Sequence, residues 1–220
     1  MITLLKRTAT RAALALAVAG VLGTVALTAS DREPEIVPVA AATEADRASL
    51  GAETVRALDN LARTGKLSAA DRKALAKNRK VAAQVVDPAK TKVHDVSTAA
   101  AGKAGKKGCH RADRYISYKT VLGAKAFEWH KVLHYCWSAN GKVTIKERRH
   151  YIKNNDGFNY DRGLVSNTQS GKNTPHYAST MQGKVENCIV KYGCIRMNNP
   201  YIRIVVNGNK GLPYQIWQRP

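Results

Sequence analysis

The sequence predicts a mainly β protein whose C-terminal domain is an antiparallel sandwich or barrel. Three observations support this fold class. From Cys109 onward, apolar and polar residues alternate in short segments, as in half-buried strands. Turn signals such as Asn140-Gly141 separate these segments. All fourteen aromatic residues and all four cysteines also lie at or beyond Cys109, so residues 109–220 hold most of the side chains from which a core can be built.

Residues 1–30 predict a secretory signal peptide. Three basic residues precede an uncharged run rich in alanine, leucine and valine that extends from Ala12 to Ala29. Small residues fit cleavage after residue 30, and a second Ala-x-Ala site allows cleavage as late as residue 42. The alternative is an uncleaved membrane anchor, because about 18 apolar residues is near the lower limit for crossing a bilayer. We therefore expect a secreted, extracellular protein and leave its association with the envelope open.

Residues 43–92 predict a helical hairpin that acts as a spacer. The segments TEAD and SAAD, which begin at Thr43 and Ser68, have the spacing of capping boxes at helix N-termini. The apolar stripe that follows each of them is thin, so we expect the hairpin to be marginal, exposed or docked on another surface. Residues 93–108 are rich in alanine, glycine and lysine and predict a flexible basic linker.

The disulfide-bonded β domain is expected over residues 109–220. Its predicted strands cover residues 115–122, 127–137, 143–152, 177–188, 194–197, 201–206 and 212–217. The Asn140-Gly141 pair predicts a type I′ hairpin turn, whose two central residues both need positive φ. Residues 159–175 are rich in Asn, Ser, Gly and Thr and predict a long surface loop, and such loops are often functional.

Four cysteines in an exported chain predict two disulfides. A tight hairpin that turns near Lys191 sets Cys188 opposite Cys194, which leaves Cys109 to pair with Cys136. Zinc is the rival explanation, but Cys-x5-Cys lacks the short spacing of common zinc sites. We therefore expect no metal and no cofactor.

The charge of the β domain favours an anionic partner. Residues 109–220 contain eighteen basic and six acidic residues, a net charge of +12 within a whole chain of +20. Such an excess favours an anionic polymer of the cell envelope or another extracellular polyanion, nucleic acid included. The alternative is that the positive surface only keeps a secreted protein soluble.

The hairpin around Asn140-Gly141 has one face that we predict as a binding surface. The other face carries Cys136 and branched aliphatic side chains, and we assign it to the core. The predicted binding face combines aromatic rings, which can stack on a ligand, with cations that hold its negative groups. Its members are Trp129, Lys131, Tyr135, Trp137, Lys146, Arg148 and His150. The alternative is that this face packs as well, with its long basic side chains reaching outward.

A secreted hydrolase is a second hypothesis, with its site around residues 150–180. The candidate residues there are His150, Asp156, Asp161, His176, Ser166, Ser170 and Ser179. No nucleophile, metal-binding or phosphate-binding motif places them in roles, so we assign no catalytic residue. Antagonism of competing bacteria, as by a bacteriocin, is a third hypothesis. We favour a non-catalytic extracellular module that binds polyanions.

Two segments beyond Cys109 carry a recognisable pattern, together with the predicted export signal at the N-terminus. They read ISYKTVLGAKAFEWHKVLHYCWSANGKVT and MQGKVENCIVKYGCIRMNNPYIRIVVNGNKG. On these segments, residues 109–217 resemble a group of small, uncharacterised secreted proteins of high-GC Gram-positive bacteria. The resemblance implies export, the disulfides and a β-rich fold, and it implies no activity. The chain departs from the group at Tyr135-Cys136-Trp137, where the group's pattern has Trp before the cysteine and Tyr after it.

Overall fold

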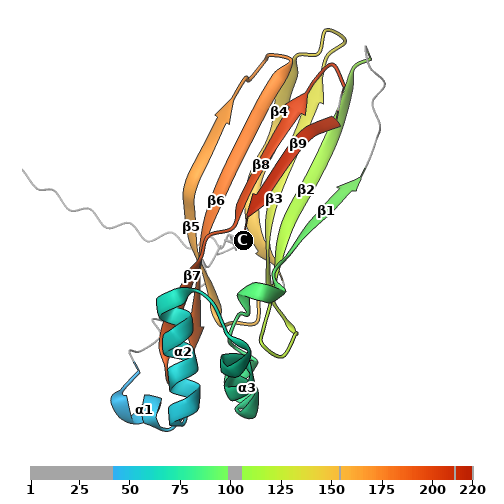
Figure 1. Cartoon of the computed structure of the whole chain (residues 1–220). Coiled ribbons are helices and arrows are strands. Elements are labelled where there is room, and N and C mark those ends of the chain that lie inside the picture. Colours follow the sequence, from blue (N-terminus) through green and yellow to red (C-terminus); the bar gives the residue numbers. More distant parts are fainter. Residues whose placement is uncertain (1–41, 99–105, 154, 211, 220) are drawn as a thin grey trace, which may run out of the picture. The chain divides into compact units, whose positions relative to one another are not determined.

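A computed structural model describes residues 42–219 except 99–105, 154 and 211 (Figure 1). The predicted signal peptide therefore lies outside the described residues. The described helices are α1 (Glu44–Ala48), α2 (Ala52–Thr64), α3 (Ala69–Lys77), α4 (Arg79–Ala82) and the 3-10 helix η1 (Pro88–Lys90). The strands are β1 (Lys92–Thr98), β2 (Gly108–Lys119), β3 (Lys125–Trp137), β4 (Val143–Lys153), β5 (Asn159–Ser170), β6 (His176–Ile189), β7 (Gly193–Asn198), β8 (Tyr201–Asn207) and β9 (Leu212–Arg219). None of the helices in this part of the chain has the length and hydropathy of a membrane span.

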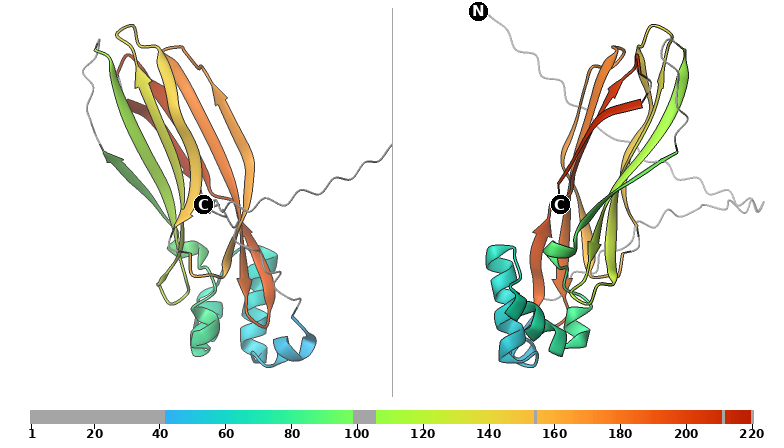
Figure 2. Two further views of the ribbon diagram at one scale, coloured as in Figure 1. Left: turned by 180° about the vertical axis from the view of Figure 1, so that it is seen from behind. Right: turned by 45° about the vertical axis from the view of Figure 1, so that its right-hand side comes forward.

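The strands form two antiparallel sheets that face each other (Figure 2). In sheet 1 the strand order is β1-β2-β3-β4. In sheet 2 the order is β5-β6-β8-β9, and β7 pairs with β6. The predicted antiparallel sandwich is therefore confirmed.

The core between the sheets is built from the aromatic face of β3. Phe127, Trp129 and Tyr135 on this strand are fully buried, and they pack with apolar residues of sheet 2 such as Tyr177 and Met181. The prediction that the opposite face of β3 forms the core was wrong. Large aromatic side chains bury more apolar area than a cysteine and two or three branched aliphatics, so the sandwich closes over the aromatic face.

A β-bulge at Lys146 changes the register near the β3–β4 turn. His134 lies opposite Glu147, but the next residue, Tyr135, lies opposite Ile145. The extra residue brings Ile145 to the core side of β4, where it packs against the core. The turn itself is not type I′, because only its glycine, Gly141, has a positive φ, of 80°.

Two segments that we predicted to be irregular are edge strands. The predicted loop at residues 159–175 forms β5 as far as Ser170, and the predicted linker at 93–108 begins within β1. Each of these strands has a hydrogen-bonded neighbour on one side only. An edge strand can remain polar and exposed along most of its length, so its composition resembles that of a loop.

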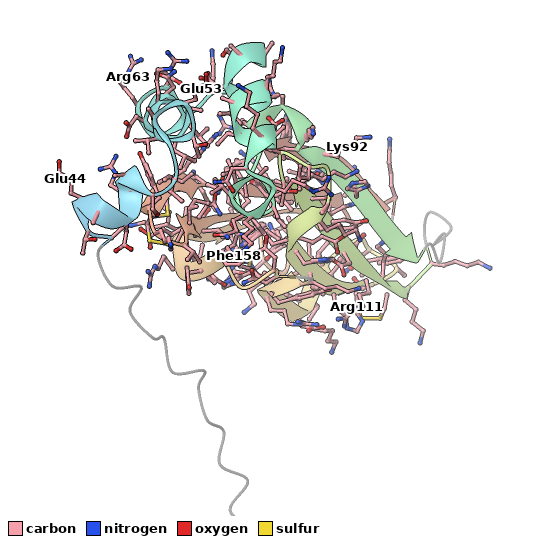
Figure 3. The ribbon with its side chains drawn as sticks, turned by 90° about the horizontal axis from the view of Figure 1, so that it is seen from below. Glu44, Glu53, Arg63, Lys92, Arg111 and Phe158 are labelled. Atoms are coloured by element: carbon pink, nitrogen blue, oxygen red, sulfur yellow. A yellow bond between two sulfur atoms is a disulfide. The ribbon has the colours of Figure 1, made fainter. Side chains whose placement is uncertain are left out.

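The helices pack against the end of the sandwich formed by the β6–β7 hairpin. Leu58, Leu61 and Leu75 form a second buried cluster with Ile189 and Ile195 of this hairpin. Both predicted capping boxes, at Thr43 and Ser68, are present. Figure 3 shows this region from below, with charged side chains such as Arg63 on the outer surface of α2.

The predicted cysteine pairs are the ones that the structure joins. Cys109–Cys136 links β2 to β3 across 27 positions of sequence, and we call it the long bridge. Cys188–Cys194 links β6 to β7 across 6 positions, and we call it the short bridge. In each bridge the two cysteines lie directly opposite each other in the strand register.

Candidate binding site

The seven residues predicted as a binding face do not form an exposed surface. Trp129, Lys131 and Tyr135 are 0% exposed, and Trp137 is 4% exposed. The remaining three lie on β4: Lys146 is exposed at the bulge, while Arg148 and His150 are half-buried. The face assignment fails for the reason given above, because the sandwich closes over these aromatic rings.

Lys131 fastens sheet 1 to sheet 2 from within the core. Its Nζ donates to the backbone carbonyl of Ser179 at 2.5 Å and to that of Ile202 at 3.1 Å. Burial, together with the nearby charges of Arg148 and Arg203, lowers the pKa of Lys131 to about 6. At neutral pH most of this amine is therefore uncharged, which allows it to lie in an apolar core.

Arg148 makes a second connection between the sheets. Its Nε donates to the hydroxyl of Ser179 at 2.8 Å, and its Nη2 donates to the carbonyls of Thr168 and Thr180 at 2.6 and 2.9 Å. Burial lowers the pKa of Arg148 below its usual value. Because its donors are used in this way, Arg148 acts in structure rather than as a free surface cation.

Among the residues of the hydrolase hypothesis, His150 and Asp161 form a close pair. His150 Nε2 lies 3.4 Å from Asp161 Oδ2, and the ring of His150 stacks on Trp129. The hydroxyl of Ser179 is buried and accepts from Arg148, while Asp156 accepts hydrogen bonds within its own turn. Within the described ranges, no hydrogen bond joins a histidine ring to a serine hydroxyl. This arrangement does not assemble a serine nucleophile with a base.

Two groups of side chains in the described chain lie close enough to share a metal ion. One is the long bridge with His134, and the other is the short bridge with Glu186. In each group, two of the three ligand atoms are sulfurs of a disulfide. Cysteine binds metals as the thiolate, so neither group offers a metal site while the bridges are intact.

The outer face of sheet 1 carries a row of stacked rings. His94, Tyr115, His130 and Tyr151 follow one another across β1 to β4, with centroid separations of 4.7, 4.6 and 4.4 Å. The two inner rings, Tyr115 and His130, are covered on both faces by their neighbours in the row. The row therefore stabilises the sheet, and its two inner rings offer edges, not faces, to a ligand.

Carboxylates on this outer face are occupied by neighbouring side chains. Asp113 lies 2.9 Å from His130 Nδ1 and also accepts from the hydroxyl of Tyr151. Glu128 contacts the other ring nitrogen of His130 and accepts from Lys125 at 2.7 Å. The charges of this part of sheet 1 are thus paired within the face.

The outer face of sheet 2 carries exposed aromatic and cationic side chains in alternation. On β8 and β9, Tyr201 lies opposite Arg219, and Arg203 lies opposite Trp217. The guanidinium carbon of Arg203 lies 5.2 Å from the Trp217 ring centroid, and that of Arg219 lies 4.7 Å from the Tyr201 centroid. We call these four residues the arginine–aromatic patch. Together with Ile216 and Gln218, the patch lines a depression of about 520 Å³.

The guanidinium groups of the patch have no carboxylate partner in the described part of the chain. The strands of sheet 2 contain two acidic residues, Asp161 and Glu186. Asp161 faces His150, and Glu186 accepts from Arg162 at 2.6 Å. Two arginines on a face without a free acid can therefore bind negative groups of a ligand.

The sequence contains a signal for the patch that our predictions missed. Tyr201 and Arg203 are two positions apart on one predicted strand, and Trp217 and Arg219 are two positions apart on or just past another. Residues i and i+2 of a strand share a face, and the turn at residues 207–211 predicts a hairpin between these strands. The same aromatic–basic criterion, applied to this hairpin, indicates the patch.

No protein-family model matches the chain, and no curated protein or solved structure matches it either. The resemblance to a group of secreted bacterial proteins therefore stays a prediction. The two disulfides are compatible with an extracellular protein. A function has to be argued from the geometry of the arginine–aromatic patch.

Proposed function

We propose that the protein is a secreted, non-catalytic module that binds anionic polymers of the cell envelope or other extracellular polyanions. The proposed site is the arginine–aromatic patch. The observation that carries the proposal is the pair of guanidinium groups, Arg203 and Arg219, exposed beside aromatic rings on a face whose acids are already paired.

The chemistry of the patch fits this role. A guanidinium group can bind a carboxylate or phosphate through two parallel hydrogen bonds, and it remains charged at any physiological pH. Each guanidinium lies over an aromatic ring, which fixes its position before a ligand arrives. The net charge of the domain adds long-range attraction that brings polyanions toward the surface.

Retention on immobilised heparin tests the proposal with a matched control. The test variant is Arg203→Ser with Arg219→Ser, and the control is Lys142→Ser with Lys172→Ser, which removes the same charge from exposed turns. We expect the test variant to elute at clearly lower salt than wild type, and the control to elute close to wild type. Equal losses for both variants would show that binding follows net charge and not the patch. Lack of wild-type retention would overturn the proposal.

A further inference from the structure

We infer that the ligand of this surface is an anionic glycan that lies across the strands of sheet 2, an inference that rests on the proposed function. It is drawn from side chains that continue the patch across the outer face of the sheet. The strand register places them in two rows that run from β9 through β8 and β6 to β5. The rows are Trp217, Arg203, Thr180, Thr168 and Arg219, Tyr201, Gln182, Ser166.

These side chains point away from the core. On β6, the intervening residues Ser179 and Met181 are buried, while Thr180 and Gln182 are half-buried. Their partners on β5 and β8 lie directly opposite and therefore share their face. Adjacent strands are about 4.8 Å apart, so each row extends roughly 14 Å across the sheet. A linear ligand can contact both ends of a row.

Beyond the arginines, the rows offer neutral polar groups. The side chains of Thr180, Gln182, Ser166 and Thr168 make no hydrogen bond to another residue in the described ranges. Hydroxyl and amide groups both donate and accept, which is also the hydrogen-bonding character of sugar hydroxyls. These groups are therefore available to a chain of sugars that extends from the patch.

The distribution of charge argues for a glycan over a nucleic acid. A nucleic-acid strand carries one charge per nucleotide, and proteins that follow it repeat cations along their groove. Here the cations gather at the β8–β9 end of the rows, and Lys184 borders the second row on β6. One face of each patch ring is already covered by a guanidinium, which limits base stacking. A glycan with acidic groups separated by neutral hydroxyls fits this pattern better.

Tryptophan fluorescence can report on the site. Trp217 is 44% exposed, whereas Trp129 and Trp137 are 0% and 4% exposed. Acrylamide should therefore quench mainly Trp217, and a ligand on the patch should protect it. Trp217→Phe provides the control, because the quencher-sensitive emission should disappear in that variant.

The test compares four probes: hyaluronate, neutral dextran, inorganic polyphosphate and single-stranded DNA. We expect hyaluronate to protect Trp217 at the lowest concentration and dextran to give no protection. The variant Thr180→Val with Gln182→Met removes polar groups and no charge. It should weaken hyaluronate binding by about tenfold, the loss of one or two hydrogen bonds, and leave polyphosphate binding unchanged.

The outcomes separate the two proposals. If polyphosphate and hyaluronate bind alike and the β6 variant weakens neither, the glycan inference is wrong while polyanion binding stands. If single-stranded DNA binds most tightly, the ligand is a nucleic acid and the glycan inference is also wrong. If no polyanion protects Trp217, the proposed function is wrong as well. Thr168→Val, on the edge strand β5, repeats the test where a change to the fold is least expected.

Discussion

Lys131 should make the protein more stable in alkaline than in neutral solution. Burial lowers its pKa to about 6, whereas the ordinary value is 10.5. Between these two values the unfolded chain binds more protons at this position than the folded chain does. The free energy of unfolding should therefore rise with pH across this window, by up to about 1.4 kcal/mol per pH unit.

The size of the effect follows from the pKa and the contacts of Lys131. At pH 7, folding has to remove the proton from an amine whose ordinary pKa is 10.5. This costs about 5 kcal/mol, since each unit between that pKa and the pH contributes about 1.4 kcal/mol. Lys131→Met removes this cost, but it also removes two hydrogen bonds to carbonyls of sheet 2, worth about 1 kcal/mol each. We expect the variant to be more stable than wild type by about 3 kcal/mol at pH 7, and the difference to vanish near pH 9.

Urea denaturation at several pH values between about 6 and 9 measures both quantities. The control is Lys142→Met, an exposed lysine in the β3–β4 turn, whose difference from wild type should not change with pH. No free cysteine is present to exchange disulfides at the alkaline end. If the separation between wild type and Lys131→Met stays constant over this range, Lys131 keeps an ordinary pKa and the reasoning fails.

Three further predictions concern stability. Replacing both cysteines of the long bridge by alanine should lower the free energy of unfolding by about 3.5 kcal/mol, and the same change in the short bridge should lower it by about 2 kcal/mol. The difference arises because closing a longer loop removes more entropy from the unfolded chain. Equal losses in urea denaturation would contradict this. Gly183→Ala should cost about 2 kcal/mol, because an added Cβ would lie 2.4 Å from Trp129 Nε1, and an unchanged melting temperature would refute that packing. Asp87→Asn should cost about 3 kcal/mol, since it breaks the ion pair of a fully buried carboxylate with Arg72. Burial alone would raise the pKa of Asp87, but hydrogen bonds from Arg72 leave it lowered. The stability that the Asp87 carboxylate contributes should therefore be lost as the pH falls below the usual pKa range of Asp. If the loss of stability in Asp87→Asn does not change with pH, this account is wrong.

The fold class could be predicted because alternation and turn residues are local signals. Strands β3, β4, β6 and β8 carry apolar residues at every second position or in buried runs, and their predicted ranges overlap the observed ones. Strands β1 and β5 have no such pattern, since an edge strand needs little apolar surface. Their existence depends on pairing with neighbouring strands, which composition does not show.

A cysteine could not show which face of β3 forms the core. We took Cys136 as a marker of the core, but the long bridge lies on the outer face of sheet 1, where Cys109 is exposed. A disulfide between directly opposite residues can sit on either face of a sheet. The aromatic area on the other face was the stronger signal, because burial free energy scales with apolar area.

The same error misplaced the binding site. An aromatic and basic face is a signal of binding only when it is exposed, and exposure depends on which sheet covers it. On β3, sheet 2 covers the face, so Lys131 becomes an internal connection. The aromatic and basic side chains of β8 and β9 lie on the outer face of sheet 2 instead of between the sheets. Arg203 and Trp217 are therefore exposed.

The pairing of acids explains why one face of the sandwich is suited to a polyanion. On the outer face of sheet 1, Asp113 contacts His130, and Glu128 accepts a hydrogen bond from Lys125. Glu147 pairs with Arg111 and Arg149. Arg111, Lys125 and Arg149 there already have partners, so a ligand that binds them would have to displace an existing ion pair. At the patch no such competition arises, and binding a negative group costs less desolvation of paired charge. A polyanion attracted by the net charge of the domain should therefore settle on sheet 2, and charge changes on the outer face of sheet 1 should alter the rate of association more than the lifetime of the complex.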